Sequence, residues 1–206
     1  MRSLSAPRLL FVIVLFFSVH FGATAQKQVA ASSSEILHAM KRLNVLGTVM
    51  YIAAHPDDEN TRLLAYMARD RNYKTAYLAM TRGDGGQNLI GDEQGIELGL
   101  IRTQELLAAR RVDGAEQFFT RAYDFGFSKR TEEALTMWDK QKVLADAVWV
   151  IRNFKPDVII TRFPEDSRAG HGHHSGSAVI AREAFVAAAD PKMFPEQFKF
   201  GVGPWK

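Results

Sequence analysis

Hydrophobic and polar positions follow two patterns that alternate along the chain. Short apolar runs rich in β-forming residues predict strands, and longer segments with apolar residues at helical spacing predict helices. The strands are expected at 47–54, 74–80, 116–120 and 157–161, and the helices at 60–70, 96–111, 131–154 and 178–189, after a short helix that starts near Ser32. The runs at 47–54 and 157–161 are typical of strands buried on both faces. Strands alternating with helices predict an α/β fold with a parallel sheet covered on both faces.

Three chemically rich segments each follow a predicted strand: 55–60, 81–88 and 162–174. In such sheets, sites lie beyond the carboxyl ends of the strands. We therefore expect these segments to converge on one rim. The segment 162–177 is expected to be a polar loop.

The N-terminal segment resembles a leader rather than part of the fold. Arg2 and Arg8 flank an apolar run of 13 residues, 9–21, and Ala23-Thr24-Ala25 follows it. This pattern predicts a signal peptide over residues 1–25, cut before Gln26, and export to the periplasm or the extracellular space. Thirteen residues are too few to cross about 30 Å of hydrocarbon, so no stable membrane anchor is expected after cleavage. The domain is then 26–206, and because no closing element follows the last polar stretch, we expect it to be truncated at the C-terminus.

Composition narrows the possible functions. The chain of 206 residues suits one domain and has no cysteine, which excludes disulfides and thiolate metal sites. It carries 26 Lys+Arg against 23 Asp+Glu, and the leader takes two arginines with it, so the remaining net charge is 24 − 23 = +1. No basic run longer than two residues occurs there, and no nucleic-acid partner is expected.

The segment from His55 to Glu59 places one imidazole and three carboxylates directly after the first strand. Pro56 stiffens this turn, so His55 and Asp58 can face one centre. The neighbouring Asp57 points elsewhere and is free to act as a base. A helix N-terminus that merely carries acidic residues is the structural alternative.

Three histidines, His171, His173 and His174, form the second cluster. A solvated polar loop would explain them, but on a predicted site rim a metal is the better hypothesis. One of them, together with His55 and Asp58, would complete a two-histidine, one-carboxylate set. Such a set suits catalytic zinc and also the facial triad of non-haem Fe(II) enzymes. A free Asp57 beside the metal favours hydrolysis.

The remaining candidates are weaker by themselves. The glycine-rich segment 81–88 lacks a nucleotide-binding pattern and could be a simple turn. Arg102 and Glu105 lie one helical turn apart and could form a surface ion pair or anchor a substrate.

Ala54 together with His55–Glu59 resembles the AHPDDE signature of the PIG-L / LmbE-like N-acetylglucosaminyl deacetylases. The similarity extends to Thr81–Gly86, to Arg102 with Glu105 and to the late histidines, and it covers roughly residues 45–190. It implies a Rossmann-like, three-layer αβα fold with a mostly parallel sheet. It also implies Zn²⁺-dependent hydrolysis of an N-acetyl group on an amino sugar or glycoconjugate, with Fe²⁺ or another divalent metal as alternatives.

The resemblance also implies a role for each matching residue. These roles are metal binding by His55, Asp58 and His174, general-base catalysis by Asp57, oxyanion stabilisation by His171, and substrate binding by Arg102 and Asp84. The family motif His-x-Asp-His is here His-Gly-His-His, so His173 stands at the position of an Asp that tunes its neighbouring histidine. This departure bears on activity and on its pH profile.

Three other functions stay open at this point. The chain could be a catalytically silent sugar-binding domain of a larger exported protein. It could be a non-haem Fe(II) oxygenase, or a domain in which a metal is purely structural. Neither the particular sugar nor the oligomeric state follows from the sequence.

Overall fold

The computed structural model describes residues 31–206, so the expected leader and its cleavage site lie outside the described residues. The first described helix, α2 (Ser33–Arg42), begins with a capping box. Ser32 Oγ accepts a hydrogen bond from the Glu35 backbone N–H, and the Glu35 carboxylate accepts one from the Ser32 N–H. The helix start near Ser32 is therefore confirmed. None of the helices in this part of the chain is both long and apolar enough to span a bilayer.

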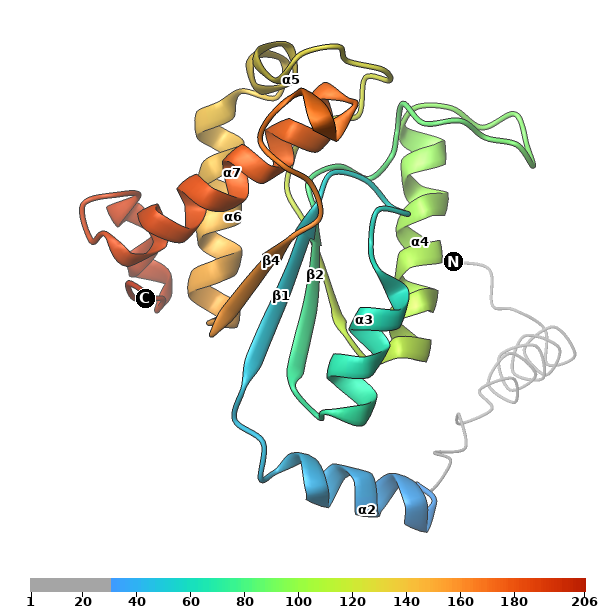
Figure 1. Cartoon of the computed structure of the whole chain (residues 1–206), viewed down its shortest axis with the longest axis vertical. Coiled ribbons are helices and arrows are strands. Elements are labelled where there is room, and N and C mark those ends of the chain that lie inside the picture. The colour runs from blue at the N-terminus through green and yellow to red at the C-terminus, as the bar shows by residue number, and fades with distance from the viewer. Residues whose placement is uncertain (1–30) are drawn as a thin grey trace, which may run out of the picture. The chain divides into compact units, whose positions relative to one another are not determined.

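Four parallel strands form the sheet at the centre of residues 41–206 (Figure 1). They are β1 (Thr48–Ala53), β2 (Lys74–Ala79), β3 (Glu116–Phe119) and β4 (Val158–Thr161), in the order β3-β2-β1-β4. Tyr51 in β1 lies opposite Tyr77 in β2 and Ile160 in β4. The predicted parallel sheet is confirmed.

Helices cover both faces of this sheet, which gives three layers (Figure 1). Met50 and Ile52 of β1 pack in the cluster that contains α6 (Lys140–Phe154) and α7 (Gly172–Ala189). Tyr51 and Ala53 face the other way, toward α3 (Thr61–Ala65) and α4 (Ile96–Asp113). The remaining short elements are the π-helical turn η1 (Tyr66–Asp70), α5 (Thr131–Met137) and the 3-10 turns η2 (Ser167–Ala169) and η3 (Pro195–Phe200).

The long helix expected over 131–154 is broken, and that prediction was wrong. Helix α5 ends at Met137 and α6 begins at Lys140. Between them Asp139 adopts a left-handed conformation with φ 56°, which ends one helix and redirects the next. The buried Trp138 holds this corner, because its indole N–H donates to the carbonyl of Tyr123.

The last helix starts six residues earlier than expected, so the loop prediction for 162–177 was wrong over its last six residues, 172–177. Ser128, which lies 45 residues before His173, caps the N-terminus of α7. The Ser128 carbonyl accepts a hydrogen bond from the Gly172 N–H, and the Ser128 Oγ accepts one from the His173 N–H. Gly172 permits this approach, since a Cβ there would clash with the backbone oxygen of Arg130. The helix therefore begins within the histidine cluster.

Strand β4 is an edge of the described sheet rather than a strand buried on both faces, which corrects the prediction for 157–161. It pairs with β1, and its first residue, Val158, is 50% exposed.

A buried arginine joins α6 to the C-terminal segment. The guanidinium of Arg152, on α6, is fully buried and donates to five backbone carbonyls and one amide oxygen. Its acceptors are Ala187, Ala188, Asp190, Met193, Phe194 and the side chain of Gln197. The positive charge is thus compensated by carbonyl dipoles that converge from the end of α7 and the start of η3.

Candidate active site

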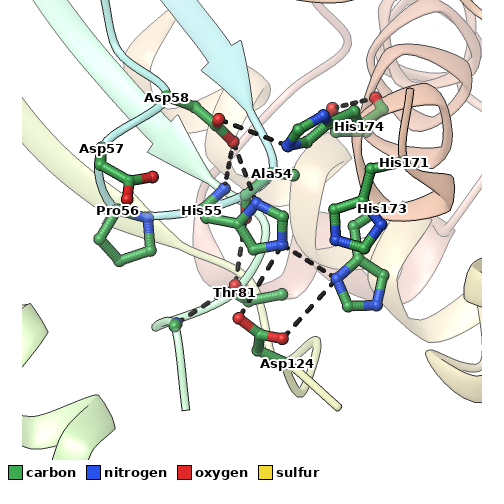
Figure 2. Close-up of polar contacts among 12 residues, drawn as sticks. Ala54, His55, Pro56, Asp57, Asp58, Thr81, Asp124, His171, His173 and His174 are labelled. Atoms are coloured by element: carbon green, nitrogen blue, oxygen red, sulfur yellow. Dashed lines mark hydrogen bonds and ion pairs between the residues drawn. The ribbon is translucent and has the colours of Figure 1, made fainter. Parts of the chain in front are cut away.

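The candidate site begins two residues after β1, at the carboxyl end of the sheet (Figure 2). The chain turns back at His55, so that Asp58 Oδ2 accepts from the His55 backbone N–H at 2.8 Å and lies 3.2 Å from His55 Nδ1. The Tyr77 hydroxyl donates to the carbonyl of His55. These contacts fix both the imidazole and the carboxylate on one side of the turn.

Asp57 points away from Asp58, as the sequence predicts for adjacent residues (Figure 2). Its backbone φ is 103°, which is rare for a residue with a side chain. Arg102 Nη2, from α4, holds the turn by donating to the Pro56 carbonyl at 2.7 Å and to Asp57 Oδ2 at 2.9 Å. Arg102 therefore pairs with the expected base rather than with Glu105.

The third carboxylate of the segment has a structural role. Glu59 is paired with Arg110 at 3.2 Å, and Arg110 is also paired with Asp113 at 2.6 Å; all three side chains are buried. Glu59 is thus held by a buried ion pair, which is neither a site role nor the helix-terminus role considered for the acidic segment.

His174, in the first turn of α7, faces Asp58. Its Nδ1 lies 3.0 Å from the Ala169 carbonyl, which makes Nδ1 the protonated nitrogen. Its Nε2 carries the lone pair and lies 3.5 Å from Asp58 Oδ1. The ring of Phe163 stacks on His174 at 3.9 Å and fixes its orientation.

His171 and the capping residue Ser128 form a second contact region. His171 Nδ1 lies 2.9 Å from the Ser128 carbonyl and 3.1 Å from its Oγ. The ring of Phe127 stacks on the His171 ring, with 5.1 Å between their centroids. His171 therefore has a fixed ring plane at the wall of the site.

His173 is fully buried behind the other histidines. Its Nδ1 lies 2.9 Å from His55 Nε2, and its ring packs against Phe125 at 4.4 Å and Trp138 at 4.8 Å. Its Nε2 has no hydrogen-bond partner. Burial, together with the neighbouring histidines, lowers the pKa of His173 to about 3, so the ring is neutral.

Sequence reasoning missed Asp124, which lies in the irregular segment after β3 (Figure 2). Its carboxylate is almost completely buried, 3.8 Å from His173 Nδ1 and 3.9 Å from His55 Nε2. The Gly126 backbone N–H donates to it at 2.9 Å. A single aspartate outside any periodic or motif segment gives no signal by which it could have been found.

Charge in the site is balanced between Asp58 and the imidazoles. Burial alone would raise the pKa of Asp58, but hydrogen bonds from His55 and the nearby His174 outweigh it and lower that pKa. Burial lowers the pKa of His174 despite its hydrogen bond to Ala169. An ionised carboxylate beside a neutral imidazole is the protonation state that binds metal cations.

Among residues 31–206, two groups of side chains could hold a metal ion: His55 with Asp58 and His174, and His55 with His171 and His173. Within each group the ligand atoms lie within 4.8 Å of one another. The first group fits a divalent metal better, because it includes the Asp58 carboxylate, whereas His173 of the second group is fully buried with its Nδ1 at hydrogen-bond distance from His55. In the first group His174 also has its Nδ1–H committed to a carbonyl and its Nε2 free, the arrangement typical of metal-binding histidines.

A cavity of about 960 Å³ opens in front of this cluster. Its polar wall contains His55, Asp57, Asp58, Arg102, Glu105, Asp124, His171 and His174. Its outer wall contains residues 85–91 with Leu98, Ile101 and Phe127, and of these Leu89 and Ile90 are almost fully exposed. Asp84 does not line the cavity: its carboxylate packs against Gly99 of α4, so the structure does not bring it to the other candidates.

Solved structures of other proteins share this fold. An N,N'-diacetylchitobiose deacetylase from Pyrococcus horikoshii matches 87% of this chain and 68% of its own with a TM-score of 0.59 at 18% identity. The 4-carboxy-2-hydroxymuconate hydratase GalB from Pseudomonas putida matches 79% of this chain and 62% of its own with a TM-score of 0.56, also at 18% identity. Because these two proteins differ in reaction, the likeness establishes the fold alone.

Sequence comparison is more specific. A 1D-myo-inositol 2-acetamido-2-deoxy-alpha-D-glucopyranoside deacetylase from Geodermatophilus obscurus is 32% identical over 165 residues, 72% of this chain and 56% of that protein. A mycothiol S-conjugate amidase from Streptomyces coelicolor is 30% identical over 161 residues, 72% of this chain and 55% of that protein. The chain thus spans about half the length of the curated relatives that it matches. The model of the PIG-L family, GlcNAc-PI de-N-acetylase, matches residues 50–185, and the chain belongs to this family.

Proposed function

We propose that this chain is a zinc-dependent hydrolase that removes the N-acetyl group from an N-acetylglucosaminyl compound. One observation carries the proposal: the ligand atoms of His55, Asp58 and His174 converge at the wall of a large cavity, with Asp57 beside them. Family membership supports the same reaction class. Zinc held by these three residues would act as a Lewis acid that polarises the amide carbonyl and makes water more acidic.

The residues of the chain supply the remaining chemistry. Asp57, held by Arg102, accepts a proton from the attacking water and returns it to the leaving amine. His171, whose Nδ1–H is held by the Ser128 carbonyl, would stabilise the oxyanion that forms on the amide by donating from Nε2, which requires a proton on that nitrogen as well. Arg102 would contact substrate as well, and its position in the cavity wall supports this role.

Three variants test this assignment. Asp57→Ala should retain about one zinc per chain and lose acetate release, because it removes the base and leaves the proposed ligands. His174→Ala should lose zinc, because it removes a ligand. His38→Ala, a histidine on α2 outside the site, is the control and should change neither quantity. Zinc by mass spectrometry and acetate release from N-acetylglucosamine and N,N'-diacetylchitobiose are the measurements; near-normal turnover by Asp57→Ala would refute the base assignment.

The same experiment separates the competing functions. Binding of N-acetyl sugars without acetate release would favour a silent binding domain, for which His173 at the position of the family's aspartate is the specific observation. One iron per chain, with oxygen uptake and no amide cleavage, would favour an oxygenase.

We also propose that the protein is exported. The leader pattern over residues 1–25 supports this location. An N-terminal sequence beginning at Gln26 in the periplasmic or extracellular fraction is the expected result, and an intact Met1 in the cytoplasmic fraction would refute it.

A further inference from the structure

His55 has a polar neighbour at each of its two ring nitrogens. Its Nδ1 faces Asp58 at 3.2 Å, and its Nε2 faces His173 Nδ1 at 2.9 Å. A neutral imidazole has one N–H and one lone pair. Whichever nitrogen binds a metal, the other must carry the proton and needs an acceptor for it.

The surroundings of His173 suit an acceptor rather than a ligand. The ring does not line the cavity, and Phe125 and Trp138 enclose it. Its Nδ1 is already at hydrogen-bond distance from His55, so a metal at that nitrogen would have to break this contact. The ring is completely buried, and its contact with His55 at 2.9 Å requires one of the two facing nitrogens to donate and the other to accept.

We propose that His173 is a positioning residue whose Nδ1 accepts the Nε2–H of His55 and so directs the His55 Nδ1 lone pair toward Asp58 and the metal. The inference rests on the proposed zinc site. It assigns the group His55, Asp58 and His174 as ligands and removes His173 from the ligand set.

Long-range ¹H–¹⁵N NMR of the zinc-loaded chain with labelled histidine reads these tautomers directly. The expected spectrum shows a zinc-bound His55 Nδ1, a protonated His55 Nε2 and an unprotonated, zinc-free His173 Nδ1. A zinc-bound nitrogen in His173, or a zinc-bound His55 Nε2, would overturn the proposal.

Zinc affinity, measured by competition with a chelator, provides an independent test. His173→Leu removes the acceptor and should weaken zinc binding about 10- to 100-fold, the usual effect of losing a partner of a metal-binding histidine. His173→Asn, which keeps an acceptor oxygen near the Nδ1 position, should recover most of the affinity. Phe125→Leu is the matched control, because it disturbs the packing around His173 without removing the acceptor, and it should bind zinc like the wild type.

Far-UV circular dichroism and thermal unfolding in excess chelator establish that each variant is folded before affinities are compared. Unchanged affinity in folded His173→Leu, or no recovery in folded His173→Asn, would overturn the role of His173 while leaving the proposed function intact. A wild-type chain that is folded and binds no zinc would overturn both.

Discussion

The positive φ of Asp57 predicts that the proposed general base stands at a strained backbone position. At φ 103° the Cβ of any L-residue is crowded, and such conformations cost about 1–3 kcal/mol. Glycine has no Cβ and is free of this strain. Replacing Asp57 by glycine should therefore remove the carboxylate and relieve the backbone at the same time.

The strain is isolated by comparing Asp57→Gly with Asp57→Ala, because both variants lose the ion pair with Arg102 equally. In the glycine variant, relief of the backbone strain stabilises the folded chain by about 1–3 kcal/mol. The extra conformational entropy of glycine in the unfolded chain opposes this by about 0.5–1 kcal/mol. The net expectation is that the glycine variant is more stable by about 1 kcal/mol. For a domain of this size that difference raises the thermal midpoint by about 2–4 °C.

Thermal unfolding of the metal-free variants measures this difference, and acetate release measures activity in parallel. Arg71, exposed and with an ordinary φ of −82°, offers the control pair: there the glycine variant should be less stable than the alanine variant. If Asp57→Gly is also less stable than Asp57→Ala, the backbone at Asp57 is not strained and the reasoning is refuted. Both Asp57 variants should be inactive.

Three further predictions follow from buried polar groups. Arg152→Met should destabilise the chain by about 3–5 kcal/mol in chemical denaturation, because five backbone carbonyls lose a charged donor. A loss of stability below about 1 kcal/mol would contradict the stabilising role of the buried Arg152. Ser128→Ala should lower the free energy of unfolding by about 1–2 kcal/mol, because the buried N–H of His173 loses its acceptor. The kcat should change little, because the Ser128 carbonyl still holds His171. An unchanged thermal midpoint would contradict the role of Ser128 as the cap of α7. The pKa of His173 is about 3 when folded and near 6.5 when unfolded, so below pH 6.5 the unfolded state binds a proton that the folded state does not. The free energy of unfolding of the metal-free chain should therefore fall as the pH falls, by about 1.4 kcal/mol per pH unit for this group. His173→Phe should reduce this dependence of stability on pH. An equal dependence in the variant would show that another group is responsible.

Local patterns were sufficient to predict the sheet. Each strand and most helices carry their own hydrophobic signal, and the alternation of the two implies parallel pairing and a common rim. The same logic predicts that His55, Asp58 and the late histidines come together. This part of the site follows from sequence because it lies next to regular elements.

Features set by distant contacts could not be predicted in this way. The start of α7 depends on Ser128, 45 residues before His173, and nothing near Gly172 in the sequence indicates that cap. The break at Asp139 interrupts an apolar pattern that continues across it. Asp84 lies in a segment with several acceptable turns, and its place against Gly99 is decided by packing with α4.

The central position of β1 has a consequence for the order in which the molecule assembles. β1 pairs with β2 after a short connection, but its pairing with β4 closes a loop of more than 100 residues, for example between Thr48 and Asp157, and such closures are slow. Until β4 and α7 dock, a folding chain holds His55 and Asp58 without His174. Only two of the three proposed ligands are then in place, so we expect metal to be captured after folding rather than to template it.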